Sequence, residues 1–166
     1  MPASEELLRN NEEYARAFEK SGVPAAPAKR VAVVACMDAR MDVHKILGLD
    51  EGDAHVIRNA GGVATEDVIR SLVVSQLLLG TEEIILIHHT RCGMMTVSED
   101  DLNQRVREEV GVEPPFSFET FEDLDENVRL TAARLEESPF ILKKSVRGFV
   151  YDVETGRLRE VALKSS

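Results

Sequence analysis

Hydrophobic positions in this chain form short apolar runs separated by longer segments with helical spacing. Three runs rich in Val and Ile, at residues 31–36, 54–58 and 83–88, are typical of buried strands. Two later segments, 146–152 and 157–162, are joined through a Glu-Thr-Gly turn, which is a hairpin signal and predicts an antiparallel edge. Because the first strands are almost wholly apolar, we expect a parallel sheet that is covered on both faces.

The segments between these strands carry helix signals. Residues 65–80 predict a helix, with Thr65 as its N-cap and Gly80 near its end. Together with the strands before and after it, this helix predicts a right-handed βαβ unit. Further helices are expected at 99–110, where Gly and Pro residues follow, and at 120–137, which has an apolar stripe that includes Phe121.

The first residues predict a separate helical arm. Residues 4–19 have Ser4 as a candidate cap and a partial apolar face formed by Leu7, Leu8, Tyr14, Ala15 and Phe18. Gly22 and two prolines then break the chain, so the apolar face must lie on this core or on a second subunit. The expected fold class is α/β: a mostly parallel sheet of four strands plus an antiparallel edge strand, flanked by helices, with an N-terminal helical arm. We expect a single domain over 1–166, with the arm and linker at 1–28 and the core at 29–166.

Composition and charge narrow the function classes. The 166 residues are 43% hydrophobic, and the formal net charge is −10. A protein that binds nucleic acid needs a basic surface to neutralise the phosphates, so no nucleic-acid partner is expected for this acidic chain. We also expect no membrane association, because no apolar run approaches the roughly 20 residues of a membrane span. The N-terminus lacks the features of a signal peptide, which makes a cytoplasmic location the expectation. In that compartment a disulfide between the two cysteines is disfavoured.

Both cysteines stand at the ends of expected strands, where open α/β sheets place their ligands. Cys36 ends the first run, and Cys92 closes the segment His89-Thr-Arg-Cys that follows the third. Two thiolates and one imidazole would leave a tetrahedral metal one open position, which is typical of a catalytic zinc site. Spacing does not decide between His88 and His89, and two buried thiols with a hydrogen-bonded histidine is the structural alternative.

Two neighbouring motifs extend this candidate site. Asp38 follows Cys36 by two residues, and Arg40 can hold that carboxylate in a charge-assisted pair close to a metal-bound water. A surface ion pair is the simpler interpretation of these two residues. Gly61 and Gly62 end the segment Arg58-Asn-Ala-Gly-Gly, whose backbone amides can approach a bound substrate closely. A plain tight turn and a nucleotide-binding loop are the alternatives.

These three motifs, Cys36-Met-Asp-Ala-Arg, Arg58-Asn-Ala-Gly-Gly and His89-Thr-Arg-Cys-Gly-Met, resemble the zinc-site motifs of the β-class carbonic anhydrases, in the same order and with similar gaps. The likeness begins near residue 31 and reaches the closing strands, and it is strongest to the short archaeal and actinobacterial members. The resemblance implies one Zn²⁺ per subunit, bound by Cys36, His89 and Cys92. It also implies an Asp38–Arg40 dyad that orients a zinc-bound hydroxide, or in a closed form lets Asp38 take the fourth position.

By this resemblance the expected function is reversible hydration of carbon dioxide to bicarbonate and a proton by zinc-bound hydroxide. The resemblance also implies a homodimer whose N-terminal helices embrace the partner, or a homotetramer. Two departures are Ala39, where many relatives have Ser, and Arg91, where several have Asp. His44 and His55 are candidate proton carriers, although each is more often a packing or surface residue.

Two other functions remain open from the sequence. Hydrolysis of carbonyl sulfide or carbon disulfide uses the same scaffold and the same attack on a linear carbon centre. A noncatalytic zinc-stabilised binding module is the alternative of another class, and it predicts a closed site without activity.

Overall fold

The computed structural model describes residues 2–163 of the chain. The expected domain of 1–166 extends beyond this range at both ends, and residues 1 and 164–166 lie outside the described residues. The strands are β1 (Val31–Cys36), β2 (Ala54–Asn59), β3 (Glu83–His89), β4 (Ser145–Tyr151) and β5 (Leu158–Val161). The α-helices are α1 (Ala3–Arg16), α2 (Val43–Leu47), α3 (Glu66–Leu77), α4 (Glu99–Val110) and α5 (Leu124–Glu137). Two short 3₁₀ turns, η1 (Ala60–Gly62) and η2 (Gly93–Met95), follow β2 and β3.

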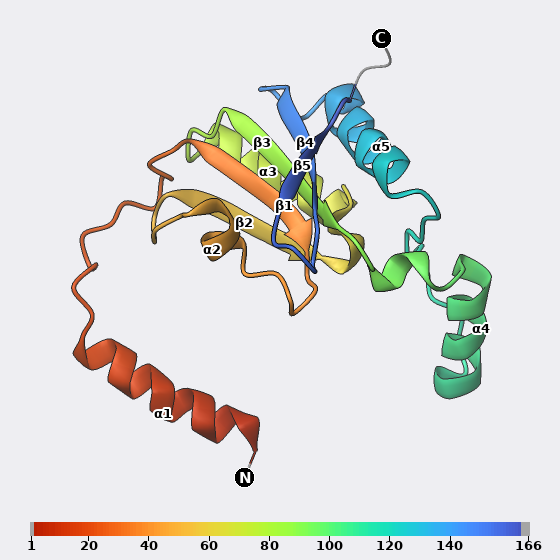
Figure 1. Cartoon of the computed structure of the whole chain (residues 1–166), viewed down its shortest axis with the longest axis horizontal. Coiled ribbons are helices and arrows are strands. Elements are labelled where there is room, and N and C mark those ends of the chain that lie inside the picture. The colour runs from red at the N-terminus through yellow and green to blue at the C-terminus, as the bar shows by residue number, and fades with distance from the viewer. Residues whose placement is uncertain (1, 164–166) are drawn as a thin grey trace.

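The five strands form one sheet in the order β2-β1-β3-β4-β5 (Figure 1). The first four are parallel, and β5 pairs antiparallel with β4. This arrangement confirms the predicted fold class, including the hairpin at the edge. Strands β1 and β3 are direct neighbours although about fifty residues separate them in sequence, because the α3 crossover returns the chain beside β1.

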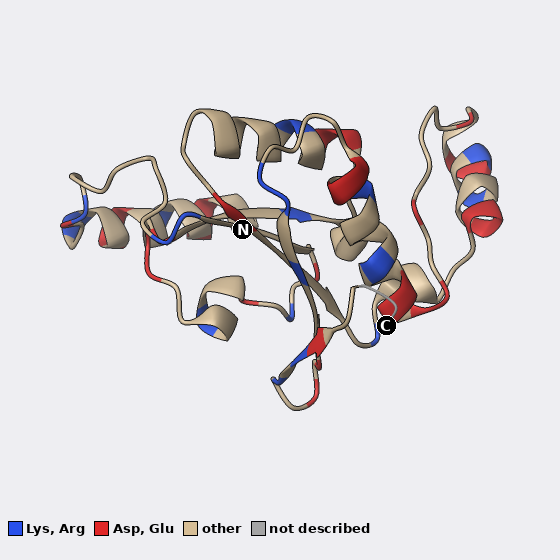
Figure 2. Ribbon diagram, turned by 90° about the horizontal axis from the view of Figure 1, so that it is seen from above, with Lys and Arg blue, Asp and Glu red and all other residues tan. Residues whose placement is uncertain are grey.

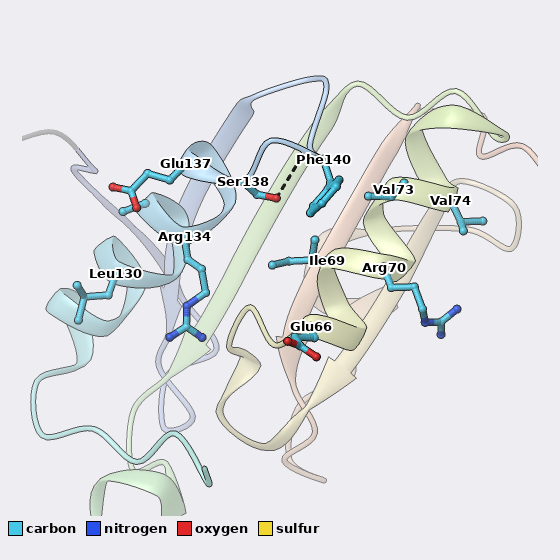
Figure 3. A pocket seen from close by; sticks show the side chains of 11 residues that line it. Glu66, Ile69, Arg70, Val73, Val74, Leu130, Arg134, Glu137, Ser138 and Phe140 are labelled. Carbon is cyan, nitrogen blue, oxygen red and sulfur yellow. Dashed lines mark hydrogen bonds between the residues drawn. The ribbon is translucent and has the colours of Figure 1, made fainter. Parts of the chain in front are cut away.

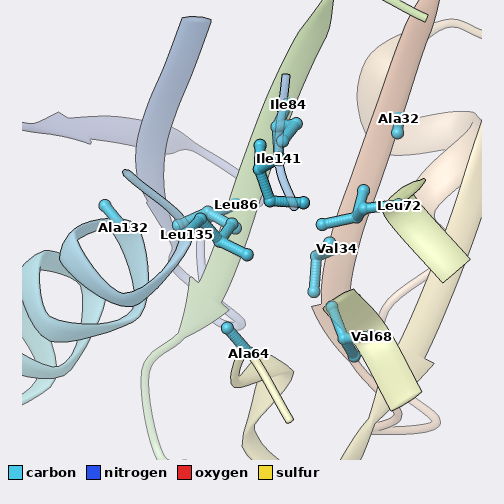
Figure 4. Close-up of a cluster of buried hydrophobic side chains, with 10 residues drawn as sticks. All are labelled: Ala32, Val34, Ala64, Val68, Leu72, Ile84, Leu86, Ala132, Leu135 and Ile141. Carbon is cyan, nitrogen blue, oxygen red and sulfur yellow. The ribbon is translucent and has the colours of Figure 1, made fainter. Parts of the chain in front are cut away.

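Helices α3 and α5 cover one face of the sheet, and α2 lies on the other (Figures 1 and 2). Side chains from β1 and β3 meet those of α3 and α5 in a buried cluster (Figure 4) made by Ala32, Val34, Ala64, Val68, Leu72, Ile84, Leu86, Ala132, Leu135 and Ile141. A second buried cluster on the α2 face includes Val33, Met41 and both cysteines. The alternating side chains of β1 therefore supply both cores, as an apolar central strand should.

Helix boundaries differ from the sequence prediction at both ends of α1, at the start of α5 and at the end of α3, which is Leu77 and not Gly80. Helix α1 begins one residue before Ser4, which is not its cap, since Pro2 holds that position without a side-chain hydrogen bond. It also ends at Arg16, three residues early. Helix α5 begins four residues late because the Asp123 side chain accepts from the Glu126 amide at 2.7 Å, which leaves Phe121 in the preceding loop.

Two other local predictions are confirmed by their caps. Thr65 caps α3 by accepting from the Val68 amide, and α4 spans the expected 99–110, with Gly111 left-handed at its end. Gly80 lies three residues past the end of α3, in a turn with φ of 73°. The five-residue helix α2, capped by Asp42, was not predicted, because one turn is too short to show a helical pattern.

The arm and the α3–α5 face are the more exposed apolar parts of the molecule. Helix α1 buries none of its residues, and it projects away from the sheet (Figure 1). Between α3 and α5 lies a groove of about 970 Å³ with Ile69, Val73 and Phe140 along it and charged residues at its rim (Figure 3). No helix within residues 2–163 is long and apolar enough to cross a lipid bilayer.

Candidate metal centre

Three side chains that suit a soft metal ion meet at the carboxyl ends of β1 and β3. Cys36 is the last residue of β1, His89 is the last residue of β3, and Cys92 follows in the turn. Their ligand atoms lie within 4.8 Å of one another, and all three residues are buried. Both cysteines are free thiols, which agrees with the prediction against a disulfide. Because β1 and β3 are adjacent in the sheet, residues far apart in sequence reach one point.

The structure distinguishes the two adjacent histidines. Nδ1 of His89 donates to its neighbour's carbonyl, Thr90 O, at 2.8 Å, which directs Nε2 toward the two sulfurs. This Nε2 is buried and has no hydrogen-bond partner. His88 instead makes a hydrogen bond from Nε2 to the Gly62 carbonyl at 3.0 Å. His89 is therefore the imidazole of the cluster, as the resemblance implied.

The electrostatics of the cluster favour one thiolate. A hydrogen bond from Cys92 lowers the pKa of Cys36, and the backbone amides of Asp38 and Gly61 lower it further. The same contact with Cys36, together with burial, raises the pKa of Cys92. Burial by itself lowers the pKa of His89, but the neighbouring Cys36 and the Thr90 carbonyl outweigh it and the net shift is upward. These opposite shifts favour a thiolate at Cys36 and a thiol at Cys92, and a divalent cation would displace the remaining proton.

Asp38 is fixed beside this cluster by Arg40. The guanidinium donates from Nε and Nη2 to the two carboxylate oxygens at 2.9 and 2.8 Å, and the Arg40 amide adds a third bond at 2.9 Å. The carboxylate oxygen Oδ2 lies 3.7 Å from His89 Nε2. These bonds to Arg40 hold the pKa of Asp38 well below its usual range, so the group is an ionised acceptor at neutral pH.

Arg58 and Asn59 organise the backbone around the cluster, although sequence reasoning named them only as part of a motif. Arg58 donates to the carbonyls of Cys36 and Asp38 at 2.9 and 2.7 Å. The Asn59 side chain makes two hydrogen bonds with the Val63 backbone, which closes the turn around the two glycines. An Arg-Asn pair at the end of a strand that lies beside a ligand strand was the available signal.

The paired glycines lie in left-handed conformations, with φ of 84° at Gly61 and 68° at Gly62. A Cβ at Gly62 would lie 2.9 Å from the Cys36 amide nitrogen, which is closer than real side chains come. The Gly61 amide is directed at the Cys36 sulfur. The glycines therefore allow the turn to press against the end of β1, and their predicted contact with a substrate stays a prediction.

Arg91 lies between the ligands but points away from them. Its φ is 55°, and its side chain pairs with Glu154 of the β4–β5 turn at 2.8 Å. Its carbonyl accepts from Arg40 Nη2 at 3.0 Å, so its backbone contributes to the dyad. Ala39 is exposed, and its methyl group leaves the Asp38–Arg40 pair intact.

The two candidate proton carriers lie on different parts of the fold. His44 is exposed on α2. His55 pairs in register with Ala32, four residues before Cys36, which places it about 13 Å along the strand toward the opposite end of the sheet. There it contacts Ser75 Oγ at 2.7 Å and the Ala25 carbonyl at 3.3 Å. Its contacts assign His55 to packing of the linker.

The donor set fits zinc. Two buried sulfurs and one imidazole nitrogen are the ligand types of a three-ligand zinc site. The hydrogen bond from His89 Nδ1 to a backbone carbonyl fixes the ring, as is usual for a zinc-binding histidine, and leaves Nε2 without a hydrogen-bond partner. Among residues 2–163 this is the cluster of three such side chains close enough to share an ion. The groove between α3 and α5 includes none of these residues.

Comparison with known proteins agrees with this geometry. A family model described as carbonic anhydrase matches residues 31–158. The chain is 53% identical to β-carbonic anhydrase 1 of Mycobacterium tuberculosis over 97% of this chain and 99% of that protein. It is 35% identical to a carbon disulfide hydrolase of Acidithiobacillus thiooxidans over 79% of this chain and 76% of that protein.

Among solved structures, the carbonic anhydrase of Streptococcus mutans superposes with a TM-score of 0.93 at 41% identity, covering 98% of this chain and 99% of that one. An apo carbon disulfide hydrolase superposes with a TM-score of 0.74 at 32% identity, covering 98% and 91%. The match spans the sheet and all three motifs around the Cys36–His89–Cys92 cluster, and on these grounds the chain belongs to the β-class carbonic anhydrase family.

Proposed function

We propose that this protein catalyses the reversible hydration of carbon dioxide at one zinc ion per subunit, held by Cys36, His89 and Cys92. The observation that carries the proposal is the buried three-ligand cluster with an ionised, clamped carboxylate at its side. Zinc bound there would lower the pKa of a water molecule toward about 7 and so supply a nucleophile for the carbon of carbon dioxide. Orientation of this nucleophile and contact with the substrate are roles for side chains and backbone amides of the protein.

Asp38 orients the nucleophile. Its carboxylate is ionised because Arg40 stabilises the negative charge, so it accepts a hydrogen bond and gives none. An acceptor at this point fixes the hydrogen of the attacking water and turns an oxygen lone pair toward the substrate. Arg40 also engages both carboxylate oxygens, which supports a resting state in which Asp38 stays off the fourth metal position.

The Gly61–Gly62 turn forms the side of the site next to Cys36. We propose that the backbone amides of these glycines contact the substrate. The support for this contact is the position of the Gly61 amide beside the Cys36 sulfur. Arg58 supports the same side by holding the carbonyls of Cys36 and Asp38.

Carbon disulfide or carbonyl sulfide is the second candidate substrate, and relatives at 33–35% identity that are named carbon disulfide hydrolases favour testing it. The 53% identity to a carbonic anhydrase over nearly the whole chain favours carbon dioxide. Stopped-flow hydration of carbon dioxide and sulfide release from both sulfur compounds should be measured on one zinc-loaded preparation. Negligible hydration with rapid sulfide release would replace the first substrate by the second.

A noncatalytic zinc module is the remaining alternative. It predicts a bound metal without an exchangeable ligand, and no turnover at any pH. Metal analysis of the purified protein, followed by anion binding to the cobalt-substituted form, separates the two. Stoichiometric zinc with an anion-sensitive cobalt spectrum and turnover supports the enzyme, and a spectrum that anions leave unchanged in an inactive protein supports the module.

We also propose a homodimer or homotetramer, a single folded domain and a cytoplasmic location. The exposed Leu7, Leu8 and Tyr14 of α1 need a covering surface, and a second copy supplies one. Two free thiols in the cluster fit a reducing compartment. Sedimentation equilibrium of the parent and of Leu8→Glu tests the assembly, because a monomeric parent contradicts it. Cell fractionation tests the location.

A further inference from the structure

His88 is a buried histidine outside the proposed ligand set, and its ring makes one hydrogen bond, at the edge of the cluster. Its side chain has no exposed surface, and Nε2 lies 3.0 Å from the Gly62 carbonyl oxygen. A carbonyl oxygen only accepts, so Nε2 carries the hydrogen and donates it. Nδ1 is buried and has no partner. The His88 ring therefore makes its one hydrogen bond to a carbonyl of the glycine turn.

This turn is in close contact with the backbone of Cys36. The position of a Cβ on Gly62 would be 2.9 Å from the Cys36 nitrogen, 3.1 Å from the Ala35 carbonyl carbon and 3.3 Å from the His88 ring. The preceding amide, that of Gly61, is directed at the Cys36 sulfur. Only the two glycines lie between the Gly61 amide and the Gly62 carbonyl, and the close contacts of Gly62 with the backbone of Ala35 and Cys36 restrict them. We therefore expect a shift of the Gly62 carbonyl to move the Gly61 amide relative to this sulfur.

The rest of the turn is held from the other sides. The Asn59 side chain bonds the Val63 amide and carbonyl at 3.0 and 2.9 Å, outside the two glycines. The Phe121 ring stacks against His88 with ring centroids 6.0 Å apart. The same ring lies next to Gly61, where an added Cβ would be 3.3 Å from it. Between these supports, the His88 side chain donates a hydrogen bond to the carbonyl of Gly62 itself.

We propose that His88 is a positioning residue: through the Gly62 carbonyl it holds the Gly61 amide against the sulfur of Cys36. An amide that donates to a thiolate withdraws charge from it, so the sulfur donates less to a bound metal and the metal becomes more electrophilic. The inference about the metal rests on the proposed zinc site. The inference about the turn does not, because the hydrogen bond is present in the chain alone.

Two replacements separate the donor from the volume of the ring. His88→Phe keeps an aromatic ring against Phe121 and removes the donor. His88→Gln restores a donor, because its amide nitrogen is the same number of bonds from Cβ as Nε2 of histidine. Val150→Ala is the matched packing control. Val150 is the register partner of His88 on β4, is buried, and packs with Val128 and Val161 in a separate cluster.

Amide hydrogen exchange in the metal-free protein is the first measurement. We expect exchange at Gly61 to be about 2- to 10-fold faster in His88→Phe, a factor that corresponds to one neutral hydrogen bond, and close to the parent in His88→Gln. Val150→Ala should leave Gly61 unchanged relative to central amides of β1. Equal Gly61 exchange in the parent and in His88→Phe overturns the proposal, as does a failure of Gln to restore protection.

The cobalt-substituted protein gives the second measurement. The thiolate-to-cobalt absorption band should shift in His88→Phe and return in His88→Gln, while Val150→Ala leaves it in place. An unshifted band in His88→Phe contradicts the effect on the metal. If His88→Phe does not fold, the Gln variant decides alone, since a shifted band there shows that the donor is not what matters. Failure of every variant and the parent to bind cobalt would instead refute the zinc site, and the exchange result would still stand.

Discussion

Replacing Asp38 by Asn tests the chemistry proposed for the carboxylate with little change in shape. In the structure Oδ1 accepts two of the three Arg40 hydrogen bonds, those from the amide and from Nε. The side-chain oxygen of Asn can accept both of these, so the residue should keep its place. The third bond, from Nη2 to Oδ2, is lost, because an amide nitrogen cannot accept it.

The change reverses the polarity of the atom that faces the reacting water. In the parent this atom, Oδ2, is an ionised acceptor 3.7 Å from His89 Nε2, and in the variant it becomes a donor. Loss of a positioned proton acceptor typically lowers turnover by about 10²- to 10⁴-fold, which is roughly 3 to 5 kcal/mol of transition-state free energy. Zinc content should remain at the parent level, because the three metal ligands are untouched.

The assay is stopped-flow hydration of carbon dioxide by zinc-loaded protein, with metal analysis of the same samples. Asp42→Asn is the matched control. Asp42 caps α2 and pairs with Lys45, away from the cluster, and Asn is an equally good cap, so parent activity is expected. A zinc-loaded Asp38→Asn enzyme with near-parent kcat would refute the role of the carboxylate. Parallel loss of activity in the Asp42 control would show that the effect is not specific.

Four further outcomes are expected. Gly62→Ala should be less stable to urea than Gly80→Ala, because both glycines have positive φ but only at Gly62 does a Cβ meet backbone, 2.9 Å from Cys36 N; equal stabilities would contradict the close approach. Leu72→Ala should lower the free energy of unfolding by about 2 to 5 kcal/mol with active-site zinc retained, since Leu72 is fully buried between α3 and the sheet; a change within experimental error would contradict this packing. Acidification should release zinc, measured with a chromogenic chelator, because protons compete for the Cys36 thiolate and the His89 imidazole. Asp38 has a lowered pKa, so the stability it contributes is present above about pH 4 and disappears as pH falls through its folded value, and proton uptake by Asp38 should not be seen near neutral pH.

The part of this fold that the sequence predicted is the part with strong periodic signals. The apolar runs located β1, β2 and β3 within a residue of their observed ends, and Thr65 located the start of α3. Weaker local signals failed. Ser4 is inside α1, and the apolar stripe assigned to 120–137 included Phe121, which lies in a loop against His88. Side-chain capping by Asp123 overrode the hydrophobic pattern at that point.

By itself the sequence determined the chemistry available to this protein: two thiols and a histidine after apolar strands, with Asp38 and Arg40 two and four residues beyond Cys36. Only the tertiary structure decided between His88 and His89, because alternation along β3 sends one ring to the glycine turn and the other to the sulfurs. It also showed Arg58 and Asn59 supporting the site, and it placed His55 at the far end of the sheet. Strand order and register set these distances, and they arise from contacts between residues that are remote in sequence.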